Sequence, residues 1–479
     1  MKKRNLILLS VFFFLSTVSV ADTGKPRYNL VVDTDGALDD FRALVMLMSG
    51  KDFHIGAITC SQGTLSSTSC YDKVVSLKSL FFHEGIPVGI GNTIQAKLPP
   101  WNSFAESIEW GFLKNNEPVT DANTVISNAV GGTSDKITFL ALGTLNTFAD
   151  WLKNNKDKAR NVDKIIWYNE SVLKDGFNYS ADSVAYNTIR NSGIPLIMVS
   201  KGERDLLCSN EYLKKIKSLR SLYASHLYKV LNKKEVAEKL EAGHSQLWDD
   251  LLPLFLTNPE LFTVINKRGF ANAILEKSIA ASQVYQRISE ILISKNESMN
   301  RVFKSFPVMG SLYKDDYSKM LASVVNKYGL TEWKAIVMTN EVHGHTGIYS
   351  IIGAKAGIRA CEYFNVEVNY LVAVSFAGKK PPLSCFNDGI QISTGATIGQ
   401  GLISIADTVL QVPTVVFECN KQKVSFSLKV DVAAKMSKDI RNGIQKYGMT
   451  GEYWEYIEEL AKKYWIDYDR HEIFDIRRL

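Results

Sequence analysis

The sequence predicts two α/β units, the larger of which is an open, mostly parallel sheet with helices on both faces. Three observations lead to this prediction. The chain has 479 residues, more than one hydrophobic core usually serves. Short β-branched runs alternate with helical stretches through residues 28–199, as parallel sheets require. A Pro-containing segment at 305–310 then precedes a second series of strands and helices, which predicts a smaller α+β domain.

The elements of the first unit, residues 27–300, follow from local patterns. Apolar runs predict strands, and stretches with helical periodicity follow them after short joints. The segment 210–300 is rich in Leu, Lys, Glu and Ala, which predicts mostly helix, interrupted near Pro253 and Pro259. The expected strands are 28–33, 54–60, 86–90, 137–142, 164–168 and 195–199, and the expected helices are 39–48, 73–83 and 145–154.

The second unit, residues 315–479, is predicted to open with a helix at 316–328. Helices are expected between its later strands. Another helical stretch, at 432–464, forms a C-terminal extension. The expected strands are 334–338, 371–376, 414–418 and 424–428.

The first 21 residues resemble a secretory signal peptide. Basic residues at 2–4 precede an apolar run over 6–20, and small residues at 19–21 resemble a cleavage site. The pattern predicts an exported protein, periplasmic or secreted; an uncleaved N-terminal anchor is the alternative. No later segment approaches ~18 uninterrupted apolar residues, so no membrane association is expected after cleavage.

Charge and cysteine usage narrow the classes further. The net charge of +6 is small for this length and the basic residues are dispersed, so no nucleic-acid partner is expected. The oligomeric state stays open, a homo-oligomer included. The six cysteines have irregular spacings without C-x-x-C, which argues against a zinc ribbon. Export would permit the disulfides Cys60–Cys70 and Cys361–Cys385, and buried free thiols are the equal alternative.

Four aspartates, Asp33, Asp35, Asp39 and Asp40, stand between the first strand and the first helix. Their carboxylates repel one another and lose hydration on burial unless a cation neutralises them. Hard cations such as calcium select such oxygens, and ligands bind at the carboxyl ends of strands in open α/β sheets. A solvated turn that caps the helix would explain Asp39 or Asp40 but not the other two. The pattern therefore predicts a metal site.

Residues 31–40 resemble the D-x-D-x-x-x-D-D signature of the inosine–uridine-preferring nucleoside hydrolases. Three further stretches are similar to that family in the same order, and the resemblance spans roughly 27–265. It implies the family's fold, and hydrolysis of the N-glycosidic bond of a nucleoside-like small molecule. The three stretches are 140–147, similar to L-x-x-G-P-L-T-N; 176–185, similar to E-F-N…D-P-E-A-A; and 248–261, similar to W-D…D-P-x-L.

The resemblance also implies a calcium site and a base. Calcium would be held by Asp35, Asp40, Asp249 and the backbone carbonyl of Asn146. Asp39 would be the general base that takes a proton from a calcium-bound water. The surrounding carboxylates would stabilise the positive charge of the oxocarbenium-like transition state.

On the substrate side, the resemblance implies that Asn178 binds the ribose hydroxyls and that Asp33 supports the site from behind. Trp248 stands where many relatives place His, and its indole cannot act as a general acid. Gly176 replaces an expected acidic sugar-binding residue, Thr64 replaces an expected Asn, and the Met-Gly-Gly stretch expected after the 164–168 strand is absent. The metal positions are therefore better kept than the sugar contacts.

The second unit carries His343 and His345 after the strand expected at 334–338. Such a pair could bind a transition metal through its imidazoles, or it could be purely structural. The Gly- and Thr-rich stretch 385–401 predicts a tight loop that presents backbone N–H groups, to an anion or simply as a turn.

Residues 315–440 resemble the E-type domain family of formylmethanofuran dehydrogenase, through its H-G-H-x-C-P-G and D-x-I-Q…T-G-C-T-x-G-x-G motifs. Both motif cysteines are absent, because the chain has Thr or Gly at 346–347 and Ala at 396. The metal-facing groups that remain are His343, His345 and Cys385. This resemblance names a domain rather than an activity.

Three hypotheses follow. The chain is an exported calcium-dependent N-glycosidase, or it is a non-catalytic ligand-binding or sensor protein that keeps the metal scaffold. In the third, the second unit holds the chemistry and the first recruits substrate. The aspartate set favours an enzyme, whereas Gly176 and Thr64 favour a binding protein.

Overall fold

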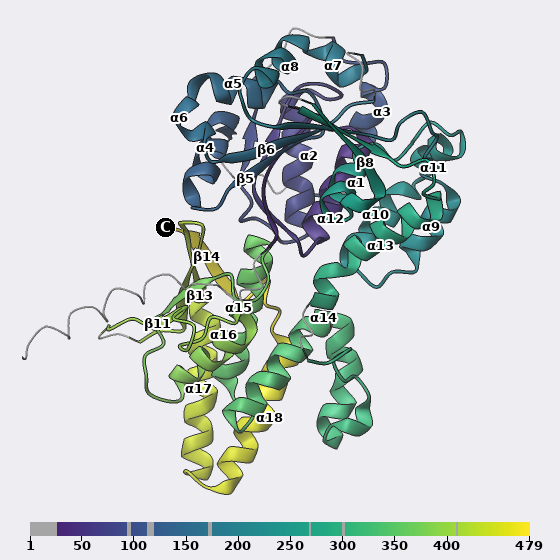
Figure 1. Ribbon diagram of the computed structural model, residues 1–479. Helices are drawn as coiled ribbons and strands as arrows, with labels where there is room; N and C mark the ends of the chain where they lie inside the picture. Colours follow the sequence, from purple (N-terminus) through teal and green to yellow (C-terminus); the bar gives the residue numbers. More distant parts are fainter. Residues whose placement is uncertain are drawn as a thin grey trace, which may run out of the picture.

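The chain folds into two units, each built on its own sheet (Figure 1). The computed structural model describes residues 26–92, 97–112, 119–170, 175–267, 270–298, 302–408 and 411–479. The segment predicted to be a signal peptide, 1–21, lies outside these residues. None of the described helices has the length and apolar character needed to cross a membrane.

The larger sheet has nine strands within the described residues, in the order β4-β3-β2-β1-β5-β6-β7-β9-β8. Neighbouring strands are parallel except β8 and β9, which pair antiparallel at one edge. The prediction of an open, mostly parallel sheet is confirmed. The strands are β1 (Tyr28–Thr34), β2 (Phe53–Cys60), β3 (Val88–Ile90), β4 (Thr120–Asp121), β5 (Ile137–Ala141), β6 (Val162–Tyr168), β7 (Leu196–Ser200), β8 (Phe262–Lys267) and β9 (Phe270–Leu275).

Helices cover both faces of this sheet. Side chains alternate along β1, so Leu30 and Val32 enter one apolar cluster and Val31 enters the other. All three are fully buried, as expected for a central strand covered on both faces. The helices are α1 (Leu38–Ser49), α2 (Ser67–Leu80), α3 (Asn102–Ser107), α4 (Ala122–Gly132), α5 (Asn146–Asn154), α6 (Lys156–Ala159), α7 (Phe177–Ala181), α8 (Ser183–Arg190), α9 (Asn210–Lys217), α10 (Leu222–Leu231), α11 (Lys234–Glu241), α12 (Leu251–Thr257), the 3₁₀ turn η1 (Pro259–Leu261) and α13 (Ala281–Ser298).

The smaller unit contains a mixed sheet in the order β11-β10-β12-β13-β14, packed with long helices around a separate apolar core. This confirms the second, smaller α+β domain. Its strands are β10 (Val372–Ser375), β11 (Ile403–Ile405), β12 (Thr414–Cys419), β13 (Gln422–Leu428) and β14 (Phe474–Arg478). Its helices are η2 (Gly310–Leu312), α14 (Asp315–His343), α15 (Ile348–Phe364), η3 (Leu383–Cys385), α16 (Phe386–Thr394), α17 (Val430–Tyr447) and α18 (Gly451–Asp467).

Two predictions for the smaller unit are wrong. The run 334–338 lies inside α14, kinked at Gly329, where Trp333 and Ile336 are buried one helical turn apart. So short an apolar run does not distinguish a strand from a buried helix. The stretch 385–401 contains α16 rather than only a loop. Its Gly389 allows close packing on α15, because a Cβ there would lie 2.1 Å from the carbonyl oxygen of Ser350.

All six cysteines are free thiols, so neither candidate disulfide is formed. The Sγ of Cys70 donates to the carbonyl of Thr34 at 3.5 Å. Gly353 of α15 packs directly against Phe386, beside Cys385, whereas Cys361 lies two helical turns farther along α15. That offset is about 12 Å along the helix axis, which is too far for a disulfide.

Buried histidines lie where the two units meet. His54 of β2 stacks on Tyr370, and its Nε2 lies 3.9 Å from the Sγ of Cys419. His83 follows α2, with its Nδ1 2.7 Å from the carbonyl of Glu362 and its Nε2 2.8 Å from the hydroxyl of Tyr223. Burial lowers the pKa of His54 to about 4 and that of His83 to about 3. Both are therefore neutral at this interface near pH 7.

We expect acid to destabilise the protein through these histidines. Their pKa values lie below the unfolded value of 6.5, so the unfolded state binds more protons as the pH falls below about 6.5. Each histidine should remove about 2 kcal/mol of unfolding free energy by pH 5. Urea unfolding at pH 7.5 and pH 5 measures the loss. His54→Phe, which keeps a ring on Tyr370, should reduce it by about half; an unchanged difference would contradict the prediction.

Candidate metal centre and pocket

The aspartate cluster lies where β1 ends and α1 begins, at the carboxyl end of the sheet. Gly36 makes the turn with φ of +89°, and a Cβ there would lie 2.6 Å from the side chain of Leu65. Asp33 is fully buried at the strand end and accepts a hydrogen bond from Thr59 Oγ1 at 2.6 Å. It therefore supports the cluster from inside the sheet rather than from the pocket.

Asp35 is held between two glycines. A Cβ on Gly63 would lie 2.1 Å from Asp35 Oδ2, and one on Gly143 would lie 2.8 Å from the same oxygen. Both glycines follow sheet strands, so their backbones bring the ends of β2 and β5 against this carboxylate. Any larger residue at either position would displace Asp35.

Asp40 is oriented by the turn itself. Its Oδ2 accepts hydrogen bonds from Thr34 Oγ1 at 2.7 Å and from the backbone N–H groups of Asp35 and Gly36 at 2.9 and 3.2 Å. These three donors all act on one oxygen. The turn thus fixes the direction of the carboxylate before any ligand binds.

Asp249 joins the cluster from the segment before α12, more than 200 residues away in sequence. Oxygens of Asp39, Asp40 and Asp249 lie within 4.8 Å of one another. Asp249 Oδ1 is buried and has no hydrogen-bond partner among the described residues. The next residue, Asp250, forms a fully buried ion pair with Arg42 of α1 at 2.8 Å, which ties this segment to the first helix.

Burial dominates the electrostatics of the cluster. It raises the pKa of Asp33 and of Asp39 to about 7, with further contributions from neighbouring carboxylates. Burial and then the adjacent aspartates raise the pKa of Asp35 and of Asp249 well above the usual range. Ionised together, these groups require a positive charge. An all-oxygen donor set with an unpaired oxygen on Asp249 fits a hard divalent cation.

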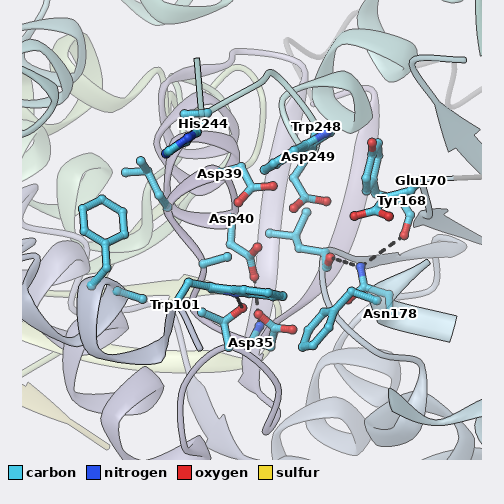
Figure 2. Close-up of a pocket in the computed structure, with 18 of the residues that line it drawn as sticks. Asp35, Asp39, Asp40, Trp101, Tyr168, Glu170, Asn178, His244, Trp248 and Asp249 are labelled. Atoms are coloured by element: carbon cyan, nitrogen blue, oxygen red, sulfur yellow. Dashed lines mark hydrogen bonds between the residues drawn. The ribbon is translucent and has the colours of Figure 1, made fainter. Parts of the chain in front are cut away.

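A cavity of about 640 Å³ opens above the cluster (Figure 2). Asp35, Asp39, Asp40 and Asp249 lie in its floor. The aromatic rings of Trp101 and Phe177 meet edge to face with centroids 5.1 Å apart. Further lining residues on the rim and walls are Trp248, His244, Lys239, Tyr168, Glu170 and Asn178. The pocket therefore combines an acidic floor with aromatic walls.

Residues 30–356 match the family described as inosine-uridine preferring nucleoside hydrolase. The chain belongs to this nucleoside hydrolase family. Residues 342–474 match a second family, described as FmdE, molybdenum formylmethanofuran dehydrogenase operon. Both family resemblances seen in the sequence are thereby confirmed.

Solved nucleoside hydrolases share similarity with part of the chain. A purine-preferring ribonucleoside hydrolase from Gardnerella vaginalis is 16% identical, with a TM-score of 0.45 over 55% of this chain and 99% of its own. A plant nucleoside hydrolase is 18% identical, with a TM-score of 0.47 over 56% and 99%. An inosine-uridine preferring enzyme from Bacillus anthracis is 13% identical, with a TM-score of 0.45 over 55% and 99%. No curated protein matches the chain.

The nucleoside hydrolase fold places most of the predicted site residues at the pocket, with two exceptions. Asn178 and Trp248 line it, together with the floor aspartates. Asp33 lies behind the floor. Asn146 is the first residue of α5 and is not among the residues that line the cavity; its side-chain oxygen accepts a hydrogen bond from the hydroxyl of Thr147. The role predicted for its backbone carbonyl stays a prediction.

Four lining residues of the nucleoside hydrolase pocket were not predicted from the sequence. Tyr168 and Glu170 stand at and just beyond the end of β6. Their position at the carboxyl end of a central strand is the signal that could have found them. Trp101 and His244 come from connections outside the sheet, and no sequence pattern marks them.

The FmdE unit does not assemble the predicted second ligand set. The rings of His343 and His345 are neighbours, 4.4 Å apart. However, His343 Nδ1 lies 2.8 Å from Asp388 Oδ2, and no group of three ligand atoms forms with Cys385 in the described chain. His343 ends α14 and His345 follows the left-handed Gly344, so the pair does not project from a strand.

Proposed function

We propose that this protein is an exported calcium-dependent N-glycosidase that hydrolyses ribonucleosides or a related N-glycoside. One observation carries the proposal: oxygens of Asp39, Asp40 and Asp249 converge in the floor of an aromatic-walled pocket in a nucleoside hydrolase domain. The sequence pattern over residues 1–21 supports export.

Calcium fits the donor set because all of the convergent groups are carboxylates. Asp35, Asp40 and Asp249 are the side chains that would hold it. When bound, the cation would act as a Lewis acid that makes water easier to deprotonate. Neutralising the buried cluster would also relieve the repulsion that raises the pKa values of these aspartates.

Asp39 is the residue that takes the proton from the attacking water. Its carboxylate stands at the start of α1, lines the pocket, and lies beside Asp40 and Asp249. Its raised pKa of about 7 makes it a stronger base than an exposed aspartate. The remaining floor carboxylates stabilise the positive charge that develops on the sugar as the N-glycosidic bond breaks.

The walls suit a flat base attached to a sugar. Trp101, Phe177 and Trp248 provide aromatic surface against which a heteroaromatic leaving group can stack. The amide nitrogen of Asn178 donates to the carbonyls of Leu142 and Tyr168 at 3.0 and 3.4 Å, so its side-chain oxygen remains to accept from a sugar hydroxyl (Figure 2).

A release assay over purine and pyrimidine ribonucleosides tests the proposal. The calcium-loaded protein should release free base and ribose from at least one member, and chelation followed by dialysis should abolish release. Calcium added back should restore it. If calcium binds and no nucleoside is cleaved, the hydrolase proposal fails, and the alternative of a ligand-binding or sensor protein is favoured.

A further inference from the structure

One pocket residue has an unexplained polar group. Tyr168 is the last residue of β6, is 3% exposed, and lines the cavity. Its neighbour Trp167 points to the opposite face of the sheet, where its Nε1 donates to the carbonyl of Gly143 at 2.9 Å. The Tyr168 hydroxyl has no hydrogen-bond partner among the described residues. A buried donor without a partner is unfavourable unless a ligand satisfies it.

The surroundings of the hydroxyl identify it as a donor. Burial, followed by the charges of Asp249, Asp39 and Glu170, raises the pKa of Tyr168 well above its usual value. The phenol therefore stays protonated. The nearby acidic groups can accept a proton from a ligand but cannot donate one when ionised.

The backbone of Tyr168 is also fixed in place. Its carbonyl accepts a hydrogen bond from the Asn178 amide at 3.4 Å, which links the end of β6 to α7. The same amide donates to the carbonyl of Leu142, beyond β5. The phenol thus projects from a rigid junction, so it does not have to be ordered when a ligand binds.

We propose that the Tyr168 hydroxyl donates a hydrogen bond to a hydroxyl of the bound sugar, and that this sugar hydroxyl donates in turn to a neighbouring carboxylate. A hydroxyl is the group that can accept from a phenol and donate to a carboxylate at once, whereas an ether oxygen can only accept. The inference rests on the proposed function, because it takes the ligand to be an N-glycoside. It makes Tyr168 a sugar-specificity residue.

Binding measurements on a slow variant test the contact. Titration calorimetry with calcium-loaded Asp39→Asn protein gives the Kd for inosine and for its 2′-, 3′- and 5′-deoxy analogues. Adding Tyr168→Phe should weaken inosine binding by about 10-fold, the typical value of one hydrogen bond. One deoxy analogue should bind equally well with and without the phenol, which identifies the hydroxyl concerned.

Tyr212→Phe is the matched control. The Tyr212 hydroxyl is also buried without a partner among the described residues, but it does not line the pocket. It should leave every Kd unchanged. If Tyr168→Phe leaves inosine binding unchanged, or weakens all four ligands equally, the sugar contact is refuted while the proposed function stands. If the Asp39→Asn parent and the wild type bind no nucleoside at all, the proposed function itself fails.

Discussion

Replacing Asp39 by Asn should lower kcat for nucleoside hydrolysis by about 10²–10⁴-fold, the usual contribution of a general base. Asn has nearly the same shape but cannot accept the proton of the attacking water. The fold should survive, because the change removes one of several buried carboxylates that raise each other's pKa values. Initial rates with a cleavable nucleoside, together with calcium titration, measure the two effects.

Asp150→Asn is the control for this substitution. Asp150 lies on α5, is partly exposed, and forms a surface ion pair with Lys153 at 3.2 Å. Its substitution should leave kcat and calcium affinity unchanged. A kcat for Asp39→Asn within threefold of wild type would show that another group deprotonates water. Loss of calcium binding in the same variant would instead identify Asp39 as an essential ligand.

Replacing Asp250 by Ala should destabilise the protein by about 3–5 kcal/mol, because it leaves the charge of Arg42 buried without its partner. Both side chains are fully buried, and Arg42 Nε lies 3.0 and 3.2 Å from the two Asp250 oxygens. Calcium affinity should fall as well, since the pair fixes the segment that carries Asp249. Urea unfolding and calcium titration measure both consequences.

Two comparisons give this prediction its meaning. Glu203→Ala breaks the exposed pair with Lys277, which is 3.4 Å long, and should change stability by less than about 1 kcal/mol. The double replacement Arg42→Met with Asp250→Leu removes both charges and should recover much of the lost stability. If Asp250→Ala is as mild as Glu203→Ala, the buried pair does not hold this junction.

Much of the larger sheet could be predicted because its strands carry their own signal. All six expected strands are present, since runs such as that of β1 are apolar on both faces and bounded by turns. The β8–β9 hairpin was not predicted. Every β8 residue after Phe262 is exposed, so this edge strand lacks the buried apolar pattern of its neighbours.

The FmdE unit shows where local pattern fails. The run 334–338 has strand composition, yet it forms part of α14. Tertiary packing explains the choice: Lys355 of α15 and Glu332 of α14 form a fully buried ion pair at 2.6 Å, and Trp333 stacks on Trp465. None of these partners is near in sequence. A short run has too little periodicity of its own to resist such contacts.

By itself, the sequence determined the α/β class, the family, and the acidic turn at 33–40, because strand alternation and crowded carboxylates are local properties. The tertiary structure alone decided which distant groups complete the site. It brought Asp249 to Asp39 and Asp40, set Trp101 against Phe177, and left the Tyr168 hydroxyl facing the cavity without a partner among the described residues. Such meetings depend on how strand ends and loops converge in space, which spacing along one chain does not encode.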